Sequence, residues 1–182
     1  MTHKHTIAMV QIKITASVKK LGDTSVEVLT EAAEAVGLKS VTVTSTQRPP
    51  KAQAEAMLAN IEGNRNIRYK WAGQQVIDLA RRMRRDKEAR VDIIAAMTAK
   101  IEKLSAMGDK YRVSNHCVSD AKFEECNVID VSYRDMPEDK QIPFLSQMVA
   151  KPEVAKVIQP LTREIAGFDM GEPALHFEIE QA

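Results

Sequence analysis

The chain has 182 residues, of which 44% are hydrophobic and 28% are charged, as expected for one folded domain and not for a disordered segment. The net charge of +1 and the 4% aromatic content argue against a protein whose whole surface attracts nucleic acid or an anionic membrane. Because the sequence shows no signal peptide and no apolar stretch long enough to span a membrane, we expect synthesis in the cytoplasm.

The first half of the chain mixes strand and helix patterns. Apolar and polar residues alternate over 10–14, which predicts a strand. The residues Thr-Ser-Val-Glu at 24–27 have the pattern of a capping box and predict a helix that ends at Gly37. The elements predicted next are a strand over 41–44, a polar turn over 45–50, a helix over about 51–60, and helical segments over about 67–104 with a seam near 86–90.

The second half begins with a polar segment, 109–127, which we predict to be a loop. The elements predicted after it are a strand over 127–133, helical segments over about 138–149 and 152–158, and a last strand in which Leu175, Phe177 and Ile179 alternate with polar residues. This order predicts a single α+β domain over residues 1–182, with helices packed around a small, mainly antiparallel sheet.

The residues with metal-binding chemistry are few. Of four histidines, His3 and His5 lie near the N-terminus, His116 lies in the polar segment, and His176 lies in the last predicted strand. Asp130 interrupts an apolar strand, where a buried carboxylate needs a metal, a histidine or an arginine as partner. If the two strands are neighbours, alternation places Asp130 and His176 on one face, and His116 could complete a His-Asp-His site for a divalent ion. The alternative is that both strand residues only pack or cap a loop.

The two cysteines, Cys117 and Cys126, are too few for a disulfide framework. Three interpretations stay open from their spacing: one disulfide bridge, two buried thiols, or a thiolate that binds a metal.

Four segments carry recognisable motifs in a fixed order. Residues 41–48 followed by Gln53 resemble a strand and an "SGYR…Q" motif, and residues 114–116 (Ser-Asn-His) resemble an "SxH" motif. Residues 128–131 (Val-Ile-Asp-Val) resemble "AxD(I/L)", and residues 172–178 (Glu-Pro-Ala-Leu-His-Phe-Glu) resemble "ExxH(W/F)E". Together they resemble the zinc D-Ala-D-Ala carboxypeptidase and L-alanyl-D-glutamate endopeptidase family of peptidoglycan metallopeptidases, over nearly the whole chain.

The resemblance implies a zinc-dependent hydrolase that cleaves peptide bonds in peptidoglycan stem peptides, as a carboxypeptidase or an endopeptidase. It would act on the cell wall as a lysin or effector, after lysis or specialised export. The implied roles are Zn²⁺ ligands for His116, Asp130 and His176, general base for Glu172, oxyanion stabilisation for Arg48, and substrate binding for Gln53 and Ser114.

The spacing of the first two implied ligands departs from the family pattern. Thirteen residues lie between His116 and Asp130, which is more than in the family, and the family's glycine is missing. A longer loop costs little chain entropy, but this one adjoins the metal site. It also contains both cysteines, so that a Cys117–Cys126 bridge could hold it, or Cys126 could compete as a ligand.

The implied general base also departs from the pattern. The family's acid lies three residues before the last histidine, where this chain has Pro173. Glu172 is one residue further away and would need a bulge to reach the site. Asp169 and Glu178 are the alternative candidates.

Two other functions compete with the enzyme. The first is a peptidase-like fold that has lost activity and serves as a binding or structural module, which the displaced acid favours. The second, which we favour less, is a helical nucleic-acid-binding protein. It would use the basic residues Arg65, Arg68, Lys70, Arg81, Arg82, Arg84, Arg85, Lys87 and Arg90, with Tyr69 and Trp71 nearby. Because Asp78, Asp86 and Glu88 are interspersed, a solvated helix face explains this stretch as well.

Overall fold

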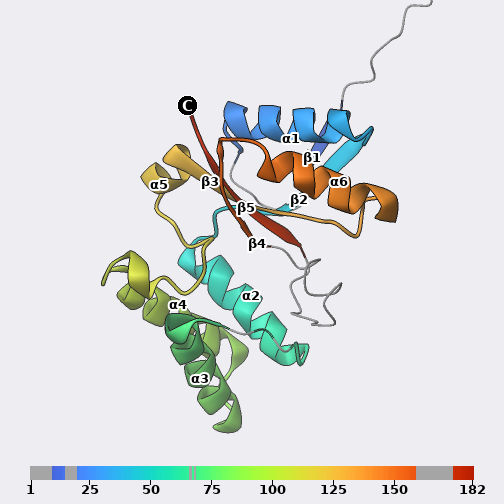
Figure 1. The fold of residues 1–182 in the computed structure, drawn as a ribbon. Coiled ribbons are helices and arrows are strands. Elements are labelled where there is room, and N and C mark those ends of the chain that lie inside the picture. The colour runs from blue at the N-terminus through green and yellow to red at the C-terminus, as the bar shows by residue number, and fades with distance from the viewer. Residues whose placement is uncertain (1–9, 15–19, 66, 68, 159–173) are drawn as a thin grey trace, which may run out of the picture.

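A five-stranded sheet with the strand order β1-β2-β3-β5-β4 lies at the centre of the protein (Figure 1). This computed structural model describes residues 10–14, 20–65, 67, 69–158 and 174–182. The strands are β1 (Gln11–Ile14), β2 (Ser40–Ser45), β3 (Cys126–Val131), β4 (Val154–Ile158) and β5 (Leu175–Glu180). β1 runs parallel to β2, whereas the other neighbouring strands pair antiparallel. The sheet is therefore mixed, and the prediction of a mainly antiparallel sheet is corrected, because a helical crossover joins β1 to β2.

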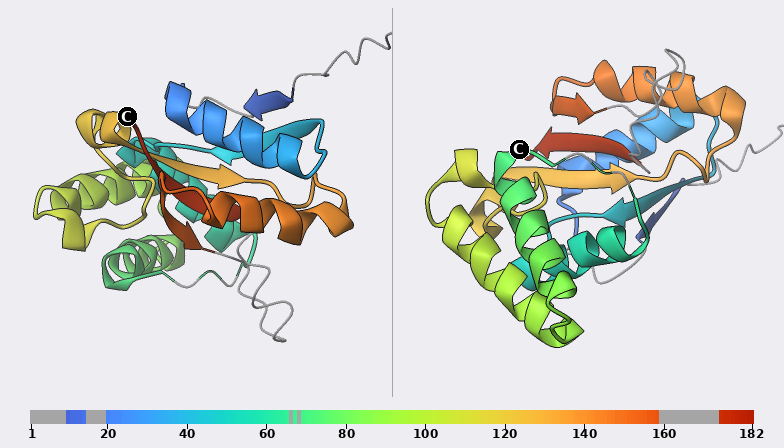
Figure 2. Two further views of the ribbon diagram at one scale, coloured as in Figure 1. Left: turned by 45° about the horizontal axis from the view of Figure 1, so that its top comes forward. Right: turned by 90° about the horizontal axis from the view of Figure 1, so that it is seen from below.

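Helices lie on both sides of this sheet, which confirms the α+β class (Figures 1 and 2). They are α1 (Asp23–Ala35), α2 (Pro50–Glu62), α3 (Trp71–Arg85), α4 (Arg90–Ser105), α5 (Asp120–Glu125) and α6 (Glu138–Val149), with a short 3₁₀ turn, η1 (Asp109–Tyr111). α1 and α6 lie side by side over the sheet, and α2, α3 and α4 pack against one another on its other side (Figures 1 and 2). None of the helices in the described part of the chain is both long enough and apolar enough to cross a membrane.

The buried apolar residues form two separate clusters. The first, which we call the sheet core, joins α1, the strands and α6, and includes Leu29, Ile129 and Phe177, all with no exposed surface. The second, the helical core, joins α2, α3 and α4 with the segment after η1, and includes Met57 and Met97. Burial of apolar area stabilises each half separately, so the molecule has a sheet half and a helical half that meet at the candidate site.

Two signals at the ends of α1 have different outcomes. The helix begins at Asp23, with Gly22 at the N-cap and no side-chain capping hydrogen bond, so the prediction of a capping box at 24–27 is wrong. Instead, the backbone N–H of Gly22 donates to the side-chain oxygen of Asn127 in β3 (2.7 Å). Gly37 has a φ of +70° just after the helix, and its N–H donates to the carbonyl of Glu34 (3.0 Å), which confirms the predicted stop signal.

Two segments have a secondary structure other than the predicted one. Residues 154–158 form β4 and not a helix, and a register shift between Val154 and Lys156 interrupts their pairing with β5. Val154, Val157 and Ile158 have the i, i+3, i+4 spacing of a helix, and the bulged strand accommodates this pattern because its side chains do not alternate regularly. The predicted loop over 109–127 contains α5, whose first turn is capped by Ser119 accepting from the N–H of Lys122 (3.2 Å).

Candidate metal centre

Two neighbouring strands place an aspartate and a histidine side by side. β3 and β5 pair antiparallel, and Asp130 is the direct partner of His176 in their register. Directly opposed residues in an antiparallel pair project to the same face of the sheet. The alternation argument from the sequence therefore holds, since the two strands are neighbours.

The third residue, His116, comes from the segment between η1 and α5 and is held by the chain that follows β2. Its Nδ1 lies 2.8 Å from the carbonyl oxygen of Thr46, and its own carbonyl accepts a hydrogen bond from the backbone N–H of Arg48 (2.9 Å). The His116 ring is almost fully buried, with 7% of the side chain exposed. These backbone contacts fix both the position of the ring and the nitrogen that faces the site.

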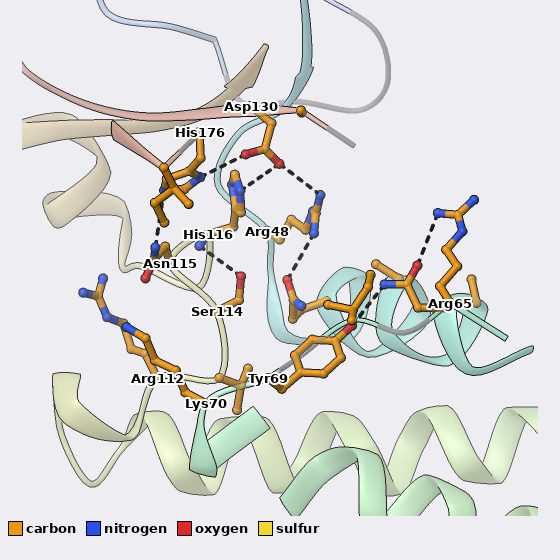
Figure 3. A pocket seen from close by; sticks show the side chains of 18 residues that line it. Arg48, Arg65, Tyr69, Lys70, Arg112, Ser114, Asn115, His116, Asp130 and His176 are labelled. Carbon is orange, nitrogen blue, oxygen red and sulfur yellow. Dashed lines mark hydrogen bonds and ion pairs between the residues drawn. The ribbon is translucent and has the colours of Figure 1, made fainter. Parts of the chain in front are cut away.

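The three side chains converge on a common point (Figure 3). His116 Nε2 lies 3.0 Å from Asp130 Oδ2, and His176 Nδ1 lies 2.9 Å from Asp130 Oδ1. One potential ligand atom from each of the three residues lies within 4.8 Å of the others. Two imidazole nitrogens and one carboxylate oxygen are a donor set that Zn²⁺ accepts, with room left for a further ligand.

The hydrogen bonding of His116 favours a positive charge between its ring and the carboxylate of Asp130. A carbonyl oxygen only accepts hydrogen bonds, so the Nδ1 that faces Thr46 carries a hydrogen. The Nε2 of a neutral ring would then turn its lone pair towards the Asp130 carboxylate, which repels it. A metal cation between the two groups removes this repulsion, so the residues present fit a bound divalent ion.

The ionisation of Asp130 agrees with such a site. Burial raises the pKa of Asp130, but hydrogen bonds from His116 and His176 outweigh it and hold that pKa well below its usual range. Burial lowers the pKa of His176, but the hydrogen bonds with Asp130 and Glu178 outweigh this effect and leave its pKa above the ordinary value. The carboxylate is thus ionised, as a metal ligand must be, whereas His176 has to release a proton before it can bind a metal.

Glu178 supports His176 and does not reach the cavity. Its Oε1 lies 3.7 Å from His176 Nε2 and accepts a hydrogen bond from Lys156 Nζ (2.7 Å). The contact with His176 comes first in lowering the pKa of Glu178 to about 2, and Lys156 adds to it. A carboxylate behind a histidine is a common outer partner in metal sites, because it orients the ring and raises its basicity.

Arg48, Gln53 and Ser114, which the sequence assigned to the site, lie around the cluster (Figure 3). Arg48 Nη2 is 3.8 Å from Asp130 Oδ2, and Arg48 Nη1 donates to Gln53 Oε1 at 3.5 Å. Gln53 is buried and lines the cavity. Its hydrogen bond to Arg48 holds the guanidinium in position. The hydroxyl of Ser114 accepts from the backbone N–H of His116 (3.3 Å) and so supports the loop that carries the first histidine.

A cavity of about 420 Å³ opens over the cluster. On the side of the helical half, its wall contains the cationic residues Arg65, Lys70 and Arg112, together with the ring of Tyr69 (Figure 3). Asp130 is the only acid among the described residues that line it. Arg65, Tyr69 and Lys70 were predicted from the sequence as part of a basic stretch and not of the site, and Arg112 was not predicted at all. A basic residue two positions before Ser114 was the available signal.

The remaining predicted residues divide into two groups. Glu172 and Asp169 lie outside the residues that the structure describes. Cys117 and Cys126 are both free thiols and do not form a bridge, and neither belongs to the His-Asp-His cluster. Burial raises the pKa of Cys117 to about 12, which disfavours the thiolate form that binds metals.

Comparisons of this chain with protein families, with curated proteins and with solved structures give no match.

Proposed function

We propose that this protein is a zinc-dependent peptidase that cleaves peptide bonds in peptidoglycan stem peptides. The observation that carries the proposal is the convergence of His116, Asp130 and His176 at the wall of an open cavity. His116 donates from its second ring nitrogen to the carbonyl of Thr46, as ligating histidines do, and the second ring nitrogen of His176 lies 3.4 Å from the amide nitrogen of Asn115 and 3.7 Å from Glu178 Oε1. This pattern favours a metal site over a purely structural ion-pair cluster.

The proposed mechanism assigns a task to each side chain. His116, Asp130 and His176 would hold the ion, which when bound supplies a Lewis acid and lowers the pKa of water. Arg48 places a fixed guanidinium beside the cluster, where it stabilises negative charge that develops on the carbonyl oxygen of the scissile bond. Gln53 holds that guanidinium in place. We propose Glu172 as the general base that takes a proton from the attacking water.

The proposed substrate class rests on the motif resemblance, and the cavity supports it. Stem peptides carry free carboxylates, and Arg65, Lys70 and Arg112 give the wall three cationic groups against a single acid. A peptide that bears carboxylates is therefore favoured over a basic one. Action at the cell wall follows from the substrate and belongs to the same proposal.

An inactive peptidase-like module is the second candidate. One observation favours it: among the described residues that line the cavity, no acid besides Asp130 is present to serve as the base. Such a protein would keep the metal and the cavity and would bind peptides without cleaving them.

The test combines metal content with hydrolysis. The protein, purified without a His tag, should contain about one zinc ion per chain by elemental analysis and should digest purified muropeptides. Asp130→Asn and His176→Ala should lose the metal and the activity. Asp135→Asn, which changes an exposed aspartate shortly after the same strand, serves as the matched control and should retain both.

The two candidates differ in one further variant. Glu172→Gln should keep the zinc while it loses hydrolysis if the protein is an enzyme with that base. Wild-type protein that binds zinc but leaves every muropeptide intact would instead establish the inactive module. Absence of zinc after reconstitution would refute both.

A further inference from the structure

A second hollow, of about 340 Å³, adjoins the cavity over the metal cluster. It lies between the end of α2, the segment that follows it, and one face of α3. Gln74, Ile77, Arg81 and Arg84 of α3 line it, at the spacing of residues that share one side of a helix. Arg81 and Arg84 are exposed, so this side of the hollow is positively charged.

The charge of this hollow is not neutralised by its surroundings. No acidic residue occurs among the described residues that line it. Of the nearby acids, Glu62 accepts from Arg90 (3.0 Å), and Asp78, which accepts from the neutral amide of Gln74 (2.8 Å), does not line the hollow. Within the described part of the chain, Arg81 and Arg84 have no ion pair of their own. Guanidinium groups in this state are suited to carboxylates, which they bind through paired N–H donors.

The end of α2 adds no opposing negative charge to the hollow. Carbonyl groups at a helix C-terminus are exposed unless the following chain satisfies them. Here the N–H groups of Gly63, Asn64 and Arg65 donate to the carbonyls of Ala59, Ile61 and Asn60 respectively. The turn therefore caps the helix, and Arg65 adds a guanidinium that is held by the side chain of Asn60 (3.3 Å).

The two cavities adjoin. Asn60, Arg65, Ile67 and Tyr69 line both of them. Figure 3 shows Arg65 and Arg112 on opposite sides of the first cavity, with Tyr69 between them, so that Arg65 marks the side from which the second cavity continues. A peptide that reaches the metal cluster can thus extend past Tyr69 to the arginines of α3.

We propose that this hollow, which we call the arginine subsite, binds a carboxylate of the same peptide chain whose scissile bond lies at the metal cluster. The inference rests on the proposed function and extends it, because it requires a substrate with an acidic group remote from the cleaved bond. The position of the hollow next to the first cavity favours an acidic peptide over a nucleic acid. The low aromatic content of the chain points the same way, since stacked bases need aromatic rings.

The experiment measures binding of fluorescein-labelled hexaglutamate by anisotropy, in zinc-free protein, so that no catalysis is needed. The Arg81→Gln/Arg84→Gln variant should bind about tenfold more weakly than wild type. The Arg82→Gln/Arg85→Gln variant removes the same charge from exposed positions of α3 that do not line the hollow, and its affinity should change less than about twofold. Equal weakening in both variants would overturn the proposal, because it would show a diffuse charge effect.

Three further probes identify the anion. Hexaglutamine with a free C-terminus reports the terminal carboxylate, C-amidated hexaglutamate reports the side-chain carboxylates, and a single-stranded oligonucleotide tests the competing ligand. Binding of either carboxylate source that depends on Arg81 and Arg84 supports the subsite. Tighter binding of the oligonucleotide at the same arginines would overturn it.

Failure of the arginine subsite and failure of the proposed peptidase function give different experimental results. If the protein cleaves muropeptides, Arg81→Gln/Arg84→Gln should raise KM for acidic substrates and leave kcat unchanged, because the arginines do not contact the reacting bond. Loss of zinc binding in the wild type would refute the peptidase proposal and the link to a scissile bond, while hexaglutamate binding would still report on the arginines. Normal hydrolysis with unchanged KM would refute the subsite alone.

Discussion

The sheet half and the helical half of the molecule contribute to the candidate site in different ways. The sheet half supplies Asp130 and His176 from strands whose register fixes the distance between them. The helical half supplies cationic side chains such as Lys70, Arg81 and Arg84, which lie on exposed surfaces. The comparison indicates that two of the three clustered side chains are placed by paired strands and the third, His116, by hydrogen bonds to the chain after β2, whereas the cationic side chains come from a helix face and from loops.

The largest expected effects come from truncating one residue in each core. Phe177 and Met97 are both fully buried, in the sheet core and the helical core respectively. Phe177→Ala should destabilise the protein by about 3–5 kcal/mol and Met97→Ala by about 2–5 kcal/mol, as measured by urea unfolding.

Zinc content then tests the division between the halves. Phe177 lies between His176 and Glu178 in β5, so its truncation should also reduce the zinc retained by the folded protein. Met97→Ala should leave the zinc content of the folded fraction unchanged. An equal loss of zinc in both variants would show that the two cores position the site together.

An intermediate effect is expected from two glycine substitutions. A Cβ at position 73 in α3 would lie 2.9 Å from the Cβ of Tyr69 and 3.0 Å from the carbonyl oxygen of Val113. Gly73→Ala should therefore cost about 1–3 kcal/mol and displace Tyr69 from the cavity wall. Gly37→Ala on the sheet side meets no steric contact but needs a positive φ, and should cost about 1 kcal/mol.

Peptide binding distinguishes these two substitutions. Hexaglutamate affinity should fall for Gly73→Ala, because Tyr69 lines both cavities, and should stay at the wild-type value for Gly37→Ala. A helical half that accommodates the extra methyl group without loss of stability or affinity would contradict the close packing described at Gly73.

The smallest effect concerns the two thiols. Cys117 is buried against the helical core, where burial raises its pKa to about 12, and Cys126 lies partly buried in β3, where burial followed by the charge of Glu178 raises its pKa. A raised thiol pKa lowers the thiolate fraction at a given pH, so both should react with iodoacetamide at pH 8 more slowly than free cysteine. Mass spectrometry should find Cys126 alkylated before Cys117. The reverse order would show that the segment around His116 opens readily.

The arrangement of the metal cluster could be predicted from the sequence because it depends on local periodicity. Alternation around Asp130 and His176 gives the face of each strand, and only the adjacency of the two strands had to be assumed. β4 was missed because its bulged pairing removes the alternation that identifies a strand. The parallel pairing of β1 with β2 is a long-range property that no periodicity encodes.

The cavity wall was harder to predict than the cluster. Arg65 and Lys70 come from the segment between α2 and α3, whereas Arg112 follows η1, and packing of the helical core brings the two segments to one cavity. A basic residue in a polar segment is also typical of an ordinary solvated surface. The helix α5 was also not predicted. Its N-cap residue, Ser119, was visible in the sequence, but a helix this short seldom shows a clear apolar period.

The tripeptide Thr46-Gln47-Arg48, which follows β2, fixes the position of His116. Its backbone holds His116, and the side chain of Gln47 donates to the carbonyl of Val118 (2.7 Å) and to Asp120 (2.9 Å). The first histidine is thus anchored across the molecule from β2, and not through the loop that leads to Asp130. Separation along the chain is thereby uncoupled from separation in space, so the thirteen residues between His116 and Asp130 can be more than a shorter loop would need while the cluster keeps its shape.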